Sequence, residues 1–212
     1  MLEVTGLTLG YNNKAVVALQ ELIVRGGEHC LITGQSGSGK TTLLYALAGL
    51  LTPIKGAICI ADTNITTLAG TKLDKFRGEN IGIIYQTLHM VPALTVLENL
   101  LLVNYCAGTP QNSGKALRLL AAVGLEGMHD KKPAQLSHGQ LQRAAIARSA
   151  MNNPKIILGD EPTSALDDDS CKAVMELLLK TAKECGASLI VATHDARIKP
   201  YFQKQLTLEE VA

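Results

Sequence analysis

A glycine-rich run that contains a lysine and two threonines carries the clearest chemistry in this sequence. Residues 34–42 read GQSGSGKTT, which fits the P-loop pattern of glycine, four further residues, glycine, lysine and a hydroxyl residue. Glycines let the backbone wrap closely around a polyphosphate, so that successive N–H groups point at negative charge. Lys40 offers a cation to the β- and γ-phosphates, and Thr41 offers a hydroxyl ligand to Mg²⁺. The run predicts ATP-type nucleotide binding through Gly34, Gln35, Ser36, Gly37, Ser38, Gly39, Lys40, Thr41 and Thr42.

Two adjacent carboxylates, Asp160 and Glu161, follow an apolar run that begins at Ile156. The run predicts a buried strand, and open α/β sheets present ligands at the carboxyl ends of their strands. We expect Asp160 to hold Mg²⁺, directly or through water, and Glu161 to orient or deprotonate an attacking water. An acidic pair after a strand is often only a turn, but the P-loop upstream favours the functional interpretation.

The elements that must position these groups follow from the hydrophobic pattern. An apolar stretch within residues 28–33 predicts a strand before the glycine run, and the Leu/Ala-rich residues 42–50 predict a helix after it. Strand and helix signals alternate again after residue 153, which favours an α/β fold with a largely parallel sheet. The later elements are expected at 156–160 (strand), 168–184 (helix) and 188–193 (strand).

Two regions depart from this alternation. Near the N-terminus, three β-like runs predict a small antiparallel sheet packed on the core, at 2–9, 16–24 and 57–60, with turns that include Asn12 and Asn13. Between about residues 87 and 153 the β signal disappears, which predicts an inserted helical subdomain. Its helices are expected at 96–103, 115–123 and 139–151. We expect one domain over residues 1–212.

Composition excludes several classes of protein. The 212 residues are 47% hydrophobic and 18% charged, enough for one packed domain, and a net charge of +1 without a basic stripe argues against nucleic acid binding. Five scattered cysteines argue against a disulfide framework and a zinc site. The sequence has neither a signal-peptide pattern at its start nor 18 consecutive apolar residues.

A third run, Leu136–Gln140 (LSHGQ) followed by LQRAAIAR, resembles the signature motif of ABC-type ATPases, usually written LSGGQ. Ser137 is placed to cap the following helix, whose N-terminus would present backbone donors to an anion. Between a P-loop and a strand that ends in Asp-Glu, this string makes the whole chain resemble an ABC nucleotide-binding domain. The resemblance implies a P-loop NTPase fold with a RecA-like core, the antiparallel β subdomain and the helical insertion. His138 stands where the motif usually has glycine.

Smaller motifs of the family match single residues. Tyr11, expected in the loop after the first strand, matches the aromatic residue that stacks on adenine, although an exposed turn tyrosine would look the same. Gln86 matches the Q-loop glutamine that meets Mg²⁺ and the attacking water. His194 matches the switch histidine that contacts the γ-phosphate, where a structural histidine is the alternative. Residues 164–167 (SALD) match the D-loop, which crosses a dimer interface.

The resemblance also implies how the site is assembled. Two chains would sandwich two ATP molecules head to tail, with the catalytic groups Lys40, Gln86, Glu161 and His194 and the magnesium ligands Thr41, Gln86 and Asp160 serving the ATP held by their own chain. The signature residues Ser137, His138, Gly139 and Gln140 would close on the ATP of the partner. ATP binding would drive closure, and hydrolysis would release it.

Residues 78–102 resemble the bacterial lipoprotein-release, macrolide-export and cell-division branch. This implies an integral membrane permease as partner and a place on the cytoplasmic face of the inner membrane. Five apolar residues could line a groove for the permease or pack inside the helical subdomain: Leu88, Met90, Val91, Leu94 and Val96. An ATP-dependent scaffold of cell division or envelope maintenance is the alternative. A soluble ABC protein of DNA repair or translation fits less well, because this chain shows no coiled-coil insertion, zinc cysteines or tandem domain.

Overall fold

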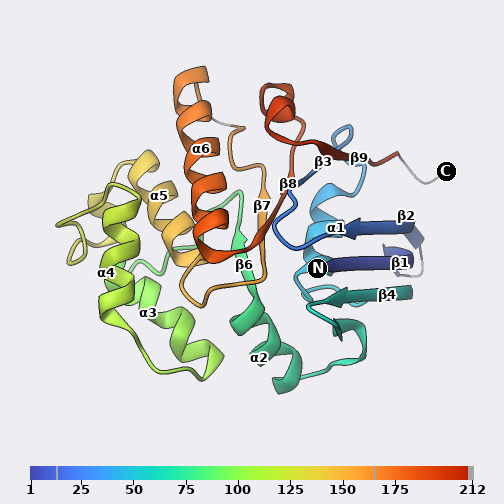
Figure 1. Ribbon diagram of the computed structural model, residues 1–212, viewed down its shortest axis with the longest axis horizontal. Helices are drawn as coiled ribbons and strands as arrows, with labels where there is room; N and C mark the ends of the chain where they lie inside the picture. Colours follow the sequence, from blue (N-terminus) through green and yellow to red (C-terminus); the bar gives the residue numbers. More distant parts are fainter. Residues whose placement is uncertain (13, 165, 210–212) are drawn as a thin grey trace.

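The computed structural model describes residues 1–12, 14–164 and 166–209. Its centre is a five-stranded sheet in which every pair of neighbours is parallel, in the order β6-β7-β8-β3-β9 (Figure 1). The strands are β3 (Cys30–Thr33), β6 (Ile81–Ile84), β7 (Ile156–Asp160), β8 (Ser188–Ala192) and β9 (Lys204–Thr207). Because all these strands run in one direction, their carboxyl ends meet at one edge, where the predicted site residues follow.

A smaller antiparallel sheet has the order β2-β1-β4-β5 and packs beside the parallel one (Figure 1). It consists of β1 (Leu2–Tyr11), β2 (Lys14–Val24), β4 (Lys55–Ile60) and β5 (Thr63–Asn64). The predicted β-like runs lie within the first three of these strands. This sheet confirms the predicted antiparallel subdomain.

Six α-helices surround the parallel sheet in the described residues. They are α1 (Lys40–Leu47), α2 (Thr71–Asn80), α3 (Val96–Ala107), α4 (Ser113–Ala122), α5 (His138–Ser149) and α6 (Asp168–Cys185). Short 3₁₀ turns are η1 (Ile65–Thr67), η2 (Pro133–Gln135) and η3 (Ala196–Tyr201). The helices predicted at 96–103, 115–123, 139–151 and 168–184 are all present, and together with the sheets they confirm the predicted α/β P-loop fold. The limits of the helical subdomain and the single-domain division stay predictions.

The parallel sheet is buried on both faces by two separate cores. On β3, Cys30 and Ile32 pack with α1 and the small sheet, whereas Leu31 between them packs with α3 to α6. Ile157 on β7 likewise points away from its neighbours Ile156 and Leu158. Strands covered on both faces are nearly continuous apolar runs, which is the pattern read from the sequence at these places.

Some elements differ from the sequence predictions. The helix expected over 42–50 begins at Lys40, inside the glycine run, and ends at Leu47, and β8 ends at Ala192 rather than 193. Neither α2 nor β9 was predicted. The predicted turn residue Asn13 lies outside the described residues, as does Ala165 of the predicted D-loop.

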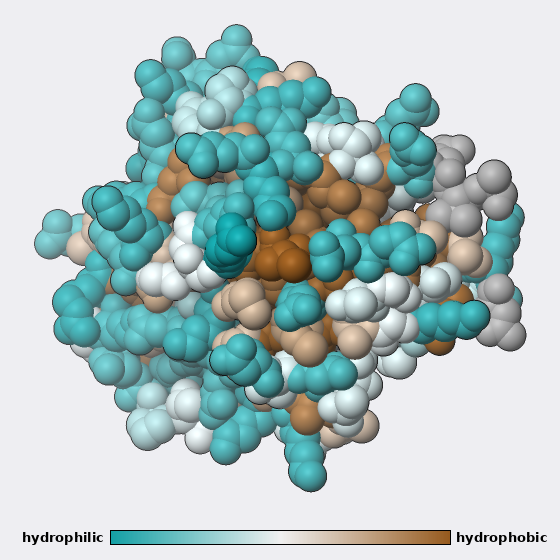
Figure 2. Space-filling view, turned by 45° about the vertical axis from the view of Figure 1, so that its right-hand side comes forward, coloured by the Kyte–Doolittle hydropathy of each residue, from teal (hydrophilic) through white to brown (hydrophobic). Residues whose placement is uncertain are grey.

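The surface is dominated by polar groups. On the face seen in Figure 2, hydrophilic side chains cover most of the area, and apolar ones gather near its centre. In the part of the chain that the structure describes, no helix has both the length and the apolar character needed to cross a bilayer.

Candidate nucleotide site

The glycine run leaves the carboxyl end of β3 and turns directly into α1. Gly39, just before the helix, has φ of 91°, in the left-handed region that glycine adopts without strain. A Cβ at this position would lie 2.3 Å from Cγ2 of Val17 on β2. Only glycine therefore lets the loop pass this close to the small sheet, and the close passage brings β2 to the edge of the site.

Lys40 is folded back over the loop that precedes it. Its Nζ donates to the carbonyl oxygens of Gly34 (3.0 Å) and Gln35 (2.9 Å), and the residue is only 8% exposed. The cation is thus held at the centre of the loop, where the backbone N–H groups and the start of α1 also favour negative charge.

Thr41 and Asp160 come from different elements and meet. The Thr41 hydroxyl donates to Oδ1 of Asp160 at 3.1 Å, although the two residues are 119 positions apart in the sequence. Burial raises the pKa of Asp160 above its ordinary value, and the Thr41 hydrogen bond and the charge of Lys40 oppose that rise. A hydroxyl beside a buried carboxylate at the end of a strand is a donor set that suits Mg²⁺ bound together with phosphate groups.

Glu161 turns away from the strand that carries Asp160. Its φ is 49°, which is uncommon for a residue with a side chain and marks a sharp turn at the strand end. The carboxylate accepts from the Thr193 hydroxyl (2.6 Å) and from the backbone N–H of His194 (3.2 Å), and its Oε1 lies 2.8 Å from Nδ1 of His194. The acid and the histidine that the sequence pointed to separately are therefore in contact.

One hollow of about 470 Å³ brings most of these residues together. Its lining consists of Val16, Ser36, Gly37, Gly39, Lys40, Thr41, Thr42, Gln86, Glu161 and His194. Three predicted residues, Gly34, Gln35 and Ser38, line a neighbouring hollow of about 610 Å³, which also reaches His194. The Ser38 side chain is buried and its hydroxyl has no partner among the described residues.

Tyr11 stands apart from this lining. The prediction that it lies in a loop is wrong, because backbone pairing with Lys14 extends the hairpin so that Tyr11 is the last residue of β1. The residue is 52% exposed and so offers its ring to solvent.

The signature residues lie elsewhere on the molecule. Ser137 caps α5 as predicted: its Oγ accepts from the Gln140 N–H (3.3 Å), and Gln140 Oε1 accepts from the Ser137 N–H (2.9 Å). His138 and Gly139 form the exposed first turn of the helix. Helix α5 belongs to the core on one face of the parallel sheet and α1 to the core on the other (Figure 1). None of the four signature residues lines the hollow at Lys40.

Sequence reasoning missed several residues that shape the site. Val16 lines the hollow, Thr193 binds the Glu161 carboxylate, and Asp195 lies behind Thr193 with its N–H donating to the Thr193 hydroxyl at 3.0 Å. The signal available was the run of polar residues 193–195 directly after an apolar strand. Such a run at a carboxyl strand end is where ligand-side groups gather.

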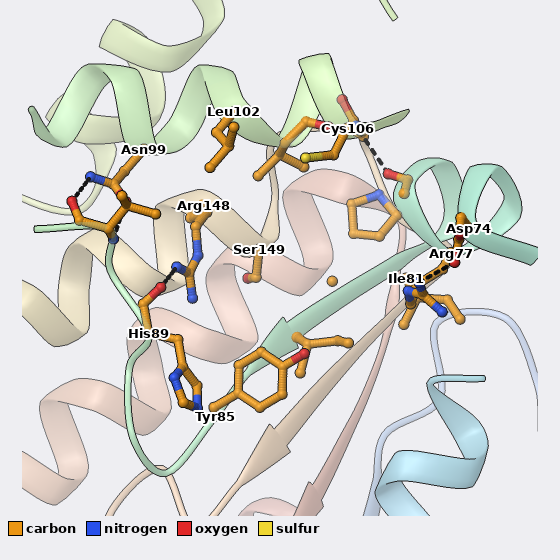
Figure 3. A pocket seen from close by; sticks show the side chains of 17 residues that line it. Asp74, Arg77, Ile81, Tyr85, His89, Asn99, Leu102, Cys106, Arg148 and Ser149 are labelled. Carbon is orange, nitrogen blue, oxygen red and sulfur yellow. Dashed lines mark hydrogen bonds and ion pairs between the residues drawn. The ribbon is translucent and has the colours of Figure 1, made fainter. Parts of the chain in front are cut away.

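A separate hollow of about 530 Å³ lies between β6, α2, α3 and α5 (Figure 3). Arg148 of α5 crosses it and donates to the carbonyl oxygens of Leu88 and His89, both at 2.7 Å. The sequence analysis left five apolar residues with two interpretations, a groove for the permease or internal packing. Of these five, only Val91 lines this hollow. Val96 is fully buried in the core and Met90 packs against that core, so the core interpretation holds for these two.

The loop, the buried carboxylate, the Glu–His contact and the capped signature helix define an ATP-hydrolysing cassette on a P-loop fold. The chain belongs to the ABC transporter family, whose family model matches residues 20–164. Binding and hydrolysis of ATP are the activity of this family.

Relatives cover most of the chain. It is 38% identical to the lipoprotein-releasing system ATP-binding protein LolD of Idiomarina loihiensis, over 87% of this chain and 82% of LolD. It is 44% identical to the putative hemin import ATP-binding protein HrtA of Staphylococcus aureus, over 88% of this chain and 85% of HrtA. Among solved structures, the ATP-binding cassette MJ0796, described as a dimer in a post-hydrolysis state with ADP and Pi, matches with a TM-score of 0.88 and 34% identity over 99% of this chain and 94% of the other.

Proposed function

We propose that two copies of this chain bind two ATP molecules between them, head to tail. The observation that carries the proposal is the separation of two half-sites on one chain. The phosphate loop opens beside α1, whereas the exposed signature turn of α5 belongs to the opposite face of the sheet. One chain cannot bring both to a single nucleotide, but two chains arranged head to tail can. The dimeric form described for the MJ0796 cassette supports this arrangement.

Each residue then has a role. Lys40 and the loop N–H groups bind the β- and γ-phosphates. Thr41, Asp160 and Gln86 would hold Mg²⁺, which would supply positive charge to offset that of the phosphates. Glu161 takes a proton from the attacking water, and His194 keeps the Glu161 carboxylate in place and contacts the γ-phosphate. Ser137 and its neighbours close over the ATP of the partner chain with the N–H groups of the first turn of α5.

We infer further that the cycle of closing and opening works on an integral membrane permease, on the cytoplasmic face of the inner membrane. The names of two relatives support this, since one is an ATP-binding protein of a lipoprotein-releasing system and the other a putative hemin import ATP-binding protein. A permease segment would bind in the hollow between α2, α3 and α5, where Val91 and Leu102 offer apolar surface. Arg148 holds the edge of this hollow in place, because it joins α5 to the backbone of Leu88 and His89. A scaffold of cell division or envelope maintenance would use the same ATP cycle without moving a substrate.

Glu161→Gln tests the shared site. The variant keeps the phosphate loop and the magnesium ligands but loses the base, so turnover should fall at least about 100-fold. The closed dimer should then accumulate with Mg-ATP and elute as a dimer from a sizing column where the parent elutes mostly as a monomer. Adding Ser137→Arg should abolish the dimer, because the new side chain occupies the space of the partner's γ-phosphate. A monomeric Glu161→Gln variant at saturating ATP would contradict the proposal.

The membrane partner is tested by copurification from membranes. Val91→Glu places a charge in the hollow and should release the permease, whereas Leu117→Glu, at a similarly exposed position on α4, should not. Equal retention of a membrane protein by both variants would remove the hollow as the docking site. A flux assay on the complex separates a transporter from a scaffold.

A further inference from the structure

Arg197 lies three residues beyond His194, in η3, and contacts two separate parts of the chain. Its Nε and Nη2 donate to the two oxygens of Asp195, at 2.9 and 2.8 Å. Its Nη1 donates to the backbone oxygen of Leu166 at 3.0 Å and to Oδ1 of Asp168 at 2.7 Å. One guanidinium therefore joins the turn after β8 to the residues that lead into α6.

Asp195 continues this connection into the candidate active site. Its backbone N–H donates to the Thr193 hydroxyl, which in turn donates to Oε2 of Glu161 at 2.6 Å. The Asp195 carboxylate also accepts from the Thr163 hydroxyl at 2.9 Å. Thr163 and Thr193 are fully buried, and the Asp195 side chain is 8% exposed. Arg197 is thus connected to the carboxylate proposed as the base through hydrogen bonds on both sides of Asp195, whose side chain binds Arg197 and whose backbone N–H binds Thr193.

We propose that Arg197 is a positioning residue for ATP hydrolysis. It fixes Leu166 and Asp168 against the turn that carries Thr193 and Asp195, and so sets the direction of the Glu161 carboxylate. The inference rests on the proposed role of Glu161 as the base.

The geometry requires arginine rather than a positive charge alone. The planar guanidinium presents its N–H groups in a fixed fork, so it binds both Asp195 oxygens while a further N–H reaches Leu166. A lysine at this position offers a single point charge and cannot keep both sets of contacts. Arg197→Lys should therefore lose activity to nearly the same extent as Arg197→Gln.

The first measurement is steady-state hydrolysis by the full chain. Arg197→Gln should lower kcat about 10- to 100-fold, the range expected for a misplaced reacting group, and leave KM for ATP within about twofold. Arg118→Gln makes the same chemical change on the exposed face of α4 and should leave kcat unchanged. A folded Arg197→Gln variant with the parent's kcat would overturn the inference.

A double-mutant cycle separates positioning from general support of the fold. If Arg197 acts through Glu161, then Arg197→Gln should change the residual single-turnover rate of Glu161→Gln less than about twofold. An equal loss in both backgrounds would mean that Arg197 only supports the fold, and the inference would be wrong. If Glu161→Gln itself hydrolyses ATP at the parent rate, then Glu161 is not the base, and the proposed function is wrong rather than the role of Arg197 alone.

Thr193→Val provides a second route if Arg197→Gln does not fold. The substitution keeps the shape of the side chain and removes the hydroxyl that binds Glu161, so it should reproduce the loss of kcat, and Thr193→Ser should restore most of it. Full activity in a folded Thr193→Val variant would break the proposed connection between Arg197 and Glu161.

Discussion

Substitution of Tyr11, at the end of β1 in the small sheet, tests whether this residue stacks on the adenine base. Stacking of a base on an aromatic ring contributes about 1–3 kcal/mol, so Tyr11→Ala should weaken ATP binding roughly 5- to 150-fold. Binding of inorganic triphosphate should not change, because that ligand has no base. Fluorescence titrations with both ligands measure this, and Tyr105→Ala, another exposed tyrosine, is the control. Equal losses for both ligands would show that Tyr11 does not contact adenine.

Asp195 gives the molecule a pH-dependent contribution to stability. Hydrogen bonds from Arg197 and from the Thr163 hydroxyl, together with the positive charge of Arg197, hold the pKa of this carboxyl at about 2, below its ordinary value of 3.8. A pKa that is lower in the folded state favours folding at pH above 3.8, and the contribution is lost as the pH falls through 2. Because Arg197 is partly exposed, solvent screens the ion pair, and we expect its contribution to the free energy of unfolding to be only about 1–2 kcal/mol.

Urea unfolding of Asp195→Asn measures this contribution. The free energy of unfolding should be lower than that of the parent at pH 6, and the difference should shrink steadily as the pH is lowered from 4 towards 2. Asp168→Asn, whose carboxylate is 90% exposed, should show little difference at any pH. A gap for Asp195→Asn that stays constant over this range would mean that the ion pair does not set the pKa.

At the scale of elements, β6 and α5 approach each other closely at one glycine. A Cβ on Gly82 would lie 2.3 Å from the backbone oxygen of Ser149, and backbone cannot move aside as a flexible side chain can. Gly82→Ala should therefore lower the free energy of unfolding by about 1–3 kcal/mol, the usual cost of overpacking. Gly26→Ala, with no atom within 4 Å of the new Cβ, is the matched control. Similar urea midpoints for the two variants would contradict this packing.

The elements that were predicted share strong local signals, and those that were missed lack them. Helix α5 begins with Ser137 at its cap and Gln140 three residues later, a pattern that marks a helix start in the sequence. Helix α2 has no buried residue, so no apolar stripe marks it in the sequence. Strand β9 has four residues and forms because β3 supplies its partner backbone, which no local pattern reveals.

The same distinction applies to the candidate site. Motif spacing pointed to Lys40, Asp160 and Glu161, because phosphate and water chemistry needs those residue types, whereas His194 was found only through the family resemblance. Spacing could not show that Glu161 turns towards Thr193 and His194, since that contact depends on the left-handed backbone at Glu161 and on the pairing of β7 with β8.

For the whole molecule, the proposed sharing of each ATP site between two chains would make hydrolysis depend on encounter between chains. The ATPase rate per chain should therefore rise with the concentration of the protein until the dimer saturates, because each site would need two chains. Ser137→Arg should remove this dependence together with most of the activity. Initial rates measured over a wide range of protein concentration at saturating Mg-ATP test it. A rate per chain that stays constant would show that the isolated chain hydrolyses ATP alone.

The position of β3 in the parallel sheet also affects the order in which the protein can mature during its synthesis. This strand leads into the phosphate loop, yet its neighbours are β8 and β9, and the Thr33 and Thr207 side chains that meet there are 174 residues apart in the sequence. At the usual speed of translation, roughly 10–35 s pass between the synthesis of Thr33 and the synthesis of Thr207. The loop is thus made well before the strands that hold β3 in place. A nascent chain should acquire ATP-dependent protection from protease only after β9 has left the ribosome, and any chaperone that attends this protein has that interval in which to act.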